Sequence, residues 1–263
     1  TQVYVPLTLT AGLTQMWSLA VEVSFYLVLP LLALLARRLP VDWRVPAIAA
    51  LAVASFAWPA LPWHLPFGVN QMNWLPALFS WFAAGMLLAE LTVMPVGRMH
   101  QLARRRWVMA AIAGVAFVIA ATPLAGNIGL APGTVGQVVV KTAMGAVVAG
   151  ALLAPLVLDA PGTPHRILGS TTMVTLGRWS YGLFIWHLAA LAMVFPVIGE
   201  FPFNGHMPIV LILTWVFGFA IAAVSYGLIE SPCRELLRRW ESRHAPSPRD
   251  SAITDAPEPA AVG

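Results

Sequence analysis

Seven long apolar segments, separated by short polar stretches, constrain this chain more than any other feature of its sequence. They are Met16 to Ala36, Val45 to Leu61, Met72 to Leu91, Trp107 to Leu124, Thr134 to Leu158, Trp179 to Ile198 and Met207 to Ile229. A helix of about 20 residues crosses a bilayer core of about 30 Å, and most of these segments have that length. The second and fourth are the shortest. The pattern predicts an all-α fold, a polytopic transmembrane helix bundle of about seven helices.

The composition excludes a water-soluble domain. Of the 263 residues, 59% are hydrophobic and 10% are charged, whereas soluble domains average about 45–50% and about 25%. No segment alternates polar and apolar residues as a barrel strand does. A formal net charge of +4 suggests nucleic acid as a partner of a soluble protein. Here the basic residues separate apolar segments, so we interpret them as topology signals and expect no nucleic-acid partner.

The basic residues lie in alternate connections. Arginines follow the first, third, fifth and seventh segments, whereas the connections 62–71, 125–133 and 199–206 and the residues before Met16 contain neither Lys nor Arg. Lys141, inside the fifth segment, is the exception. Because Lys and Arg favour the cytoplasmic side, we predict a multi-pass protein of the plasma (inner) membrane. The segment before Met16 is expected outside and the C-terminal tail in the cytoplasm.

The chain is expected to hold one folded domain. Residues 1–243 form the predicted transmembrane domain, and residues 244–263, rich in Pro, Ala and Ser, are predicted to be a disordered cytoplasmic tail. Cys233 is the single cysteine of the sequence, which excludes an intramolecular disulfide and a cysteine-based metal site. We therefore expect no metal site and no bound cofactor.

Three ionisable residues fall inside predicted helices, where they are costly and are therefore candidates for a functional site. They are Glu22, Lys141 and His187. At 1.5 Å per residue, Glu22 and Lys141 lie about 9 and about 10 Å from the outer ends of their segments. They are expected either to form a structural ion pair or to line a polar site that opens outward. His187 is either a catalytic group or a hydrogen-bonding group between helices.

The segment 17–27, which reads WSLAVEVSFYL, is the most specific motif of the chain. On a helix, Ser18, Glu22 and Tyr26 are four residues apart and share a face, and Trp17 lies at the interface. Such a stripe can bind a hydroxyl-bearing substrate or orient a catalytic base. Two further motifs follow, LGRWSYGLFIWH at residues 176–187 and SYGLIESP at residues 225–232.

These motifs resemble those of the acyltransferase 3 family, membrane proteins of bacteria and eukaryotes that transfer acetyl or other acyl groups, often onto surface polysaccharides. The segment 17–27 resembles the family's Trp-Ser-Leu, Glu, Phe-Tyr signature, with Val23 where a second acidic residue is usual. Residues 176–187 resemble its Gly, Ser-Tyr, Trp-His helix. Residues 225–232 resemble the end of its last helix, with Ser231 at a typically basic position. The three motifs occur in the family's order.

The resemblance implies a membrane-bound acyltransferase that moves an acyl group, in the first instance acetyl, from acyl-CoA to a hydroxyl of a cell-surface carbohydrate or lipid-linked acceptor. It implies Glu22 and His187 as catalytic residues. The residues implied in substrate binding are Trp17, Ser18, Tyr26, Lys141, Arg178 and Tyr181. Arg178 is expected to bind the phosphates of CoA, with a solvated helix end as the alternative. Lys141 is expected to bind an anionic carrier or substrate group.

Two other classes of protein stay open at this stage. A transporter or flippase for a lipid-linked or small-molecule substrate has discontinuous helices, which Pro30, Pro155 and Pro196 and the midplane His187 would suit. A membrane scaffold without enzymatic activity would not depend on Glu22.

Two features of the family are absent from the sequence. Its members carry an Arg or Lys followed eleven positions later by the histidine proposed as catalytic base, and no Arg or Lys here has a histidine at that spacing. The family also has more membrane helices than are predicted here. We therefore expect the chain to be a C-terminal, N-terminally truncated fragment that is inactive by itself.

Overall fold

The computed structural model describes residues 3–4, 14–63, 65, 69–126, 133–160, 162–163, 165–199, 201 and 205–244. These residues form helices and contain no strand, which confirms the predicted all-α fold. The α-helices are α1 (Met16–Arg38), α2 (Val41–Ser55), α3 (Leu75–Val93), α4 (Arg98–Ala103), α5 (Arg106–Ala120), α6 (Val135–Val157), α7 (Thr171–Ile198), α8 (Met207–Ser225) and α9 (Ser231–His244). Short 3-10 turns are η1 (Trp58–Ala60), η2 (Gln71–Asn73) and η3 (Pro123–Ala125), and a π-helical turn, η4 (Tyr226–Glu230), joins α8 to α9.

Six helical stretches are long and apolar enough to cross a membrane. They are Met16–Arg38, Val41–Ala60, Gln71–Val93, Val135–Val157, Thr171–Ile198 and Met207–Ser242, each on one of the predicted segments. The fourth predicted segment forms α5, a shorter apolar helix of 15 residues. At most 28% of the apolar window of any span is buried within the chain, so the rest of that apolar surface requires lipid. The protein is a multi-pass membrane protein.

Capping residues explain where the longest helix, α7, begins and ends. The side chain of Ser170 accepts a hydrogen bond from the backbone N–H of Met173, so α7 begins at Thr171, well before the predicted start at Trp179. Hydropathy misses this first part because it is polar. The helix ends at Gly199, whose φ of 70° is the left-handed conformation that suits glycine.

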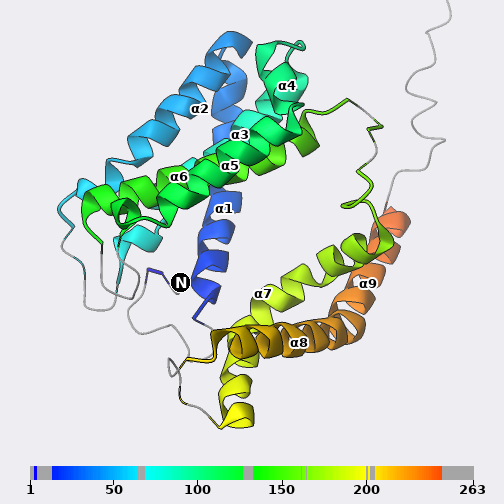
Figure 1. Cartoon of the computed structure of the whole chain (residues 1–263). Helices are drawn as coiled ribbons and strands as arrows, with labels where there is room; N and C mark the ends of the chain where they lie inside the picture. Colours follow the sequence, from blue (N-terminus) through cyan, green and yellow to red (C-terminus); the bar gives the residue numbers. More distant parts are fainter. Residues whose placement is uncertain are drawn as a thin grey trace, which may run out of the picture. The chain divides into compact units, whose positions relative to one another are not determined.

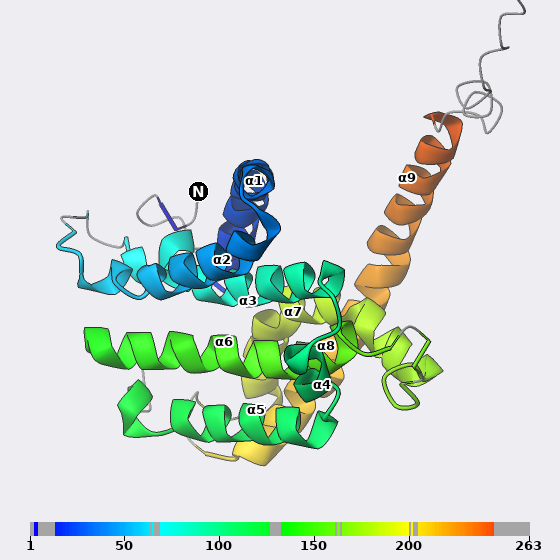
Figure 2. The ribbon, with the colours of Figure 1, turned by 90° about the horizontal axis from the view of Figure 1, so that it is seen from above.

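The chain divides into two compact units, Thr1–His165 and Arg166–Gly263, and each is described by itself. In the first unit, α2, α3, α6 and α5 pack side by side in that order, as Figure 2 shows. Helix α1 crosses this row and packs on α3 (Figure 1). The α1–α3 contact buries Val21, Phe25, Leu75 and Leu78, with Phe25 stacked on Phe82 at 4.2 Å between ring centroids.

The arginine-rich ends of the first unit are fastened by polar contacts. Arg106 pairs with Asp159 at 2.8 Å, and this hydrogen bond holds the pKa of the Asp159 carboxyl below its usual value. His100 on α4 is buried, and its Nε2 lies 2.8 Å from the carbonyl oxygen of Leu91 at the end of α3. The first contact joins the start of α5 to the chain just after α6, and the second joins α4 to the end of α3.

In the second unit, α8 packs along α7 (Figure 1) through small side chains. A Cβ added at Gly182 would lie 3.2 Å from the backbone Cα of Ala222, and Ala190, Val194 and Ala222 are completely buried. Helix α9 continues α8 beyond the π-helical turn. The predicted tail 244–263 lies outside the described residues, except that His244 is the last residue of α9.

Candidate functional site

The stripe on α1 contains one direct contact between predicted site residues. The Tyr26 hydroxyl donates a hydrogen bond to Glu22 Oε1 at 2.7 Å, the contact that residues four apart on a helix can make. Glu22 is half-buried, and Tyr26 is 57% exposed. Among the described residues no donor is bonded to the other carboxylate oxygen of Glu22. The stripe therefore presents an oriented carboxylate with one oxygen available to a further donor.

Trp17 and Ser18, the first two residues of the same motif, make contacts inside the first unit. Ser18 Oγ donates to the carbonyl oxygen of Gln15 at 3.0 Å, at the start of α1. Trp17 packs on the buried α1–α3 contact. Binding of substrate by Trp17 and Ser18 stays a prediction.

Two residues that the sequence did not single out form a contact on the side of α1 opposite to the stripe. The Tyr4 hydroxyl and Ser24 Oγ lie 3.0 Å apart. Ser24 has one hydroxyl hydrogen and donates it to the carbonyl oxygen of Ala20 at 2.8 Å, so Tyr4 is the donor to Ser24. Ser24 is two residues from Glu22. A partner 20 residues upstream has no periodic signal in the sequence, which explains why both were missed.

Lys141 does not pair with Glu22. Both residues are described, and the structure contains neither an ion pair nor a hydrogen bond between them. The side chain of Lys141 is exposed, whereas the next residue, Thr142, is buried and its carbonyl oxygen accepts a hydrogen bond from Trp81 of α3 at 2.8 Å. The predicted ion pair is therefore wrong. Depth along two helix axes says nothing about which faces of the helices meet.

His187 has a hydrogen bond that determines its tautomer when the ring is neutral. Its Nδ1 lies 2.7 Å from the carbonyl oxygen of Phe184, on the preceding turn of α7. A carbonyl oxygen only accepts, so Nδ1 carries the hydrogen and Nε2 keeps a lone pair. No partner for Nε2 is present among the described residues. His187 can therefore accept a proton or a hydrogen bond at Nε2.

Arg178 lies inside α7 and not in the connection before it, which corrects the predicted position. It is the eighth residue of the helix, and its side chain is exposed. Tyr181 is three residues further on and is 49% exposed, so the two share a face. His187 is nine residues from Arg178, about half a turn round the helix axis at about 100° per residue. The predicted residues of α7 thus lie on two faces.

The two candidate catalytic residues belong to different units, Glu22 to the first and His187 to the second. In the part of the chain that the structure describes, no group of three or more His, Cys, Asp or Glu side chains gathers as a metal site would require. The chemistry that these residues offer is that of an oriented carboxylate and an imidazole with one basic nitrogen.

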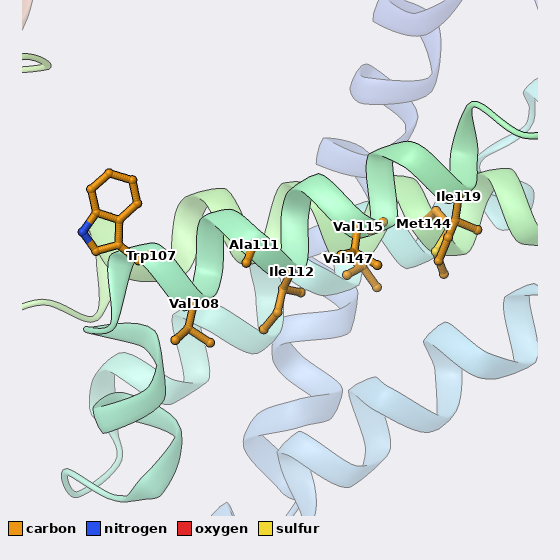
Figure 3. A pocket seen from close by; sticks show the side chains of 9 residues that line it. Trp107, Val108, Ala111, Ile112, Val115, Ile119, Met144 and Val147 are labelled. Atoms are coloured by element: carbon orange, nitrogen blue, oxygen red, sulfur yellow. The ribbon is translucent and has the colours of Figure 1, made fainter.

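Two grooves of the first unit are apolar, and none of the candidate residues lines them. Figure 3 shows one of about 600 Å³ along α5 and α6, lined by residues such as Trp107, Ile112, Val115 and Val147. A more enclosed cavity of about 280 Å³ lies between α3, α4, α5 and α6 and is lined entirely by apolar side chains and glycine. Surfaces of this kind suit lipid chains and offer no proton donor or acceptor.

Comparisons with known proteins place these observations in a family. The acyltransferase domain model of the acyltransferase 3 family matches residues 2–228, most of the chain. The chain is also 28% identical to acyltransferase MdmB of Streptomyces mycarofaciens over 270 aligned positions. That alignment covers 95% of this chain and 65% of the relative, so the chain spans less than two thirds of the relative's length. No solved structure matches. Because the family model matches most of the chain, including Glu22 and His187, the chain belongs to the acyltransferase 3 family.

Proposed function

We propose that the protein transfers an acyl group, in the first instance acetyl, from acyl-CoA to a hydroxyl of a cell-surface carbohydrate or lipid-linked acceptor. The contact between Tyr26 and Glu22 carries this proposal. It orients an intramembrane carboxylate in the motif that most resembles the family signature. An ionisable group in a bilayer is costly, and a carboxylate with an open oxygen is suited to hold an acceptor hydroxyl or to orient a base.

The reaction follows from the chemistry of a thioester. The acceptor oxygen attacks the carbonyl carbon, a new C–O bond forms, and the C–S bond of acyl-CoA breaks. The proton of the acceptor hydroxyl passes to a base and then to the departing thiolate, which leaves as the CoA thiol. A hydroxyl is a poor nucleophile without such a base. Within the chain, His187 offers a basic nitrogen, Nε2, and Glu22 offers a carboxylate oxygen that can hold the acceptor hydroxyl.

The remaining predicted residues are assigned by charge and exposure. Arg178 and Tyr181 share an exposed face of α7, and we assign them to the polyanionic CoA. Lys141 is exposed on α6, and we assign it to an anionic part of the acceptor or its carrier. The basic ends of the helices support a cytoplasmic position for CoA and a position outside the plasma membrane for the segment before Met16.

A transporter is less well supported, because the helices that contain proline are continuous. Helices α1, α6 and α7 run through Pro30, Pro155 and Pro196 without interruption. Transporters typically build the substrate site from broken helices, and none of these three has that form.

The test compares two glutamate variants of the full-length protein in membranes from cells that express its gene. The membranes are incubated with radiolabelled acetyl-CoA, and the label is counted in carbohydrate and lipid extracts. We expect Glu22→Gln to lower the label about 10²-fold, the scale of acid–base catalysis. Glu241→Gln, on the exposed part of α9, is the matched control and should change nothing.

Two results would contradict the proposal. An unchanged amount of labelled product in Glu22→Gln would remove Glu22 from the reaction. Movement of a lipid-linked sugar across proteoliposomes without acyl-CoA, together with no labelled product from the unaltered protein, would favour a flippase.

A further inference from the structure

Three tryptophans and a tyrosine form one aromatic group in the first unit, named here the tryptophan cluster (Tyr4, Trp58, Trp63 and Trp74). Trp63 lies 4.5 Å from Trp58 and 5.7 Å from Trp74 between ring centroids. Tyr4 lies 5.5 Å from Trp74. The rings come from the N-terminal residues, from the end of α2 and from the start of α3. These ends are opposite to those that carry the arginines, so the topology proposed above places the cluster on the outer side.

Two indoles of the cluster are fixed by the backbone. Trp58 Nε1 donates to the carbonyl oxygen of Gln71 at 3.2 Å, and Trp74 Nε1 donates to that of Val3 at 2.9 Å. Trp63 differs, because no hydrogen bond of its N–H is present among the described residues. Trp63 is 36% exposed and Tyr4 is 43% exposed. The cluster thus presents two partly exposed aromatic rings beside two indoles that are hydrogen-bonded to the backbone.

The cluster is connected to α1, the helix that carries the stripe. Tyr4 contacts Trp74 with its ring and donates its hydroxyl to Ser24. Ser24 lies about 3 Å along the helix axis from Glu22 and about 200° round it, so the cluster is level with the candidate carboxylate and on the other side of α1.

The segment that carries the three tryptophans is rich in amides and poor in charge. Asn70, Gln71 and Asn73 lie between Trp63 and Trp74 in the sequence, and there is no Asp, Glu, Lys or Arg between Arg44 and Glu90. Amides both donate and accept hydrogen bonds. Exposed aromatic faces pack well on weakly positive C–H groups. A neutral ring with C–H groups on one face and hydroxyls round its edge fits both properties, whereas this segment offers an anionic headgroup no Lys or Arg.

We propose that the tryptophan cluster is a binding site for a neutral sugar ring of the acceptor, with Trp63 and Tyr4 in contact with the sugar. The inference rests on the proposed function, because it names the acceptor as a glycoside. An aromatic belt at the membrane interface is the competing explanation for tryptophans at helix ends. A belt predicts no dependence of sugar binding on Trp63.

The test measures binding without turnover. The protein in lipid nanodiscs is mixed with the methyl glycosides of glucose, galactose, mannose and rhamnose, and saturation-transfer NMR records magnetisation passed from the protein to the sugar C–H groups. We expect a saturable signal with at least one glycoside. Trp63→Ala should weaken its affinity about tenfold, the effect of losing about 1.4 kcal/mol. Trp63→Phe keeps an aromatic face without the N–H, and should weaken it less.

The matched control is Trp107→Ala, which removes a tryptophan that is 89% exposed at the start of α5 and should leave the signal unchanged. No saturable signal with any of the four glycosides would overturn the proposal. So would a signal of equal strength in Trp63→Ala, or its equal loss in Trp107→Ala. The labelling assay separates the two proposals. Sugar binding without Glu22-dependent labelling contradicts only the proposed function, and labelling without Trp63-dependent binding contradicts only this inference.

Discussion

Helices α1 and α7 carry the two most specific motifs of the chain, and they are held in their units by different means. Helix α1 packs on α3 with large side chains, and Phe25 stacks on Phe82. Helix α7 packs on α8 with small ones, where Gly182 meets the backbone of Ala222. Large side chains leave cavities when they are shortened. Small residues let backbones approach and leave no room for added atoms.

The polar residues of the two helices also differ, in the kind of group that accepts or donates their hydrogen bond. On α1 the Glu22 carboxylate is bonded to another side chain, that of Tyr26, whereas on α7 the His187 ring is bonded to the backbone of its own helix. A side-chain partner can be removed by substitution without a change in the helix. The comparison therefore indicates that the orientation of Glu22 can be altered separately from its fold, and that the orientation of His187 is built into α7.

The largest effect is expected from Phe25→Ala. This ring is 8% exposed, and its removal leaves a cavity between α1 and α3. Such substitutions cost about 3–5 kcal/mol in soluble cores, where part of the loss comes from transfer out of water. Lipid replaces water as the alternative surroundings here, so we expect the free energy of unfolding to fall by about 3 kcal/mol. Titration with sodium dodecyl sulfate in mixed micelles measures it.

Leu27→Ala is the control for this variant, because Leu27 is on the same helix and is 77% exposed. A change within about 0.5 kcal/mol is expected there. Equal losses in both variants would show that α1 is not held by its contact with α3, and the contrast with α7 would fail.

A smaller loss is expected from Gly182→Ala. The added methyl would lie 3.2 Å from backbone and side-chain carbons of Ala222, so α7 and α8 must move apart. We expect a loss of about 1–2 kcal/mol in the same titration, the range of overpacked cores. Gly177 is on the same helix and has no atom within 4 Å of an added Cβ, so Gly177→Ala should be neutral or stabilise the helix. If Gly182→Ala is as stable as Gly177→Ala, close approach is not what holds this pair.

The sequence was sufficient for the features that depend on apolar periodicity and length. It located all seven apolar helices, because each is a long hydrophobic segment, but overestimated α5, which ends after 15 residues. It placed the start of α7 late, because the cap at Ser170 precedes a polar turn that hydropathy does not register. The sequence does not determine the rotation of each helix, so it left open an ion pair between Glu22 and Lys141 that the structure does not contain. Contacts that depend on helix rotation and on residues far apart in the sequence, such as Tyr4 with Ser24, are found only in the structure.

The smallest effect on stability, and the sharpest test of the comparison, is expected from Tyr26→Phe. The substitution removes the hydroxyl that donates to Glu22 Oε1 and keeps the ring, which is mostly exposed. Hydrogen bonds between side chains in membrane proteins contribute about 0.6 kcal/mol on average, so the free energy of unfolding should fall by about that amount. Transfer of label from acetyl-CoA should fall about tenfold, because the carboxylate loses the partner that orients it. A loss of stability as large as that of Phe25→Ala would mean that the polar contact holds α1 in place, and the distinction between packing and orientation would be lost. Unchanged transfer would mean that Glu22 does not need Tyr26.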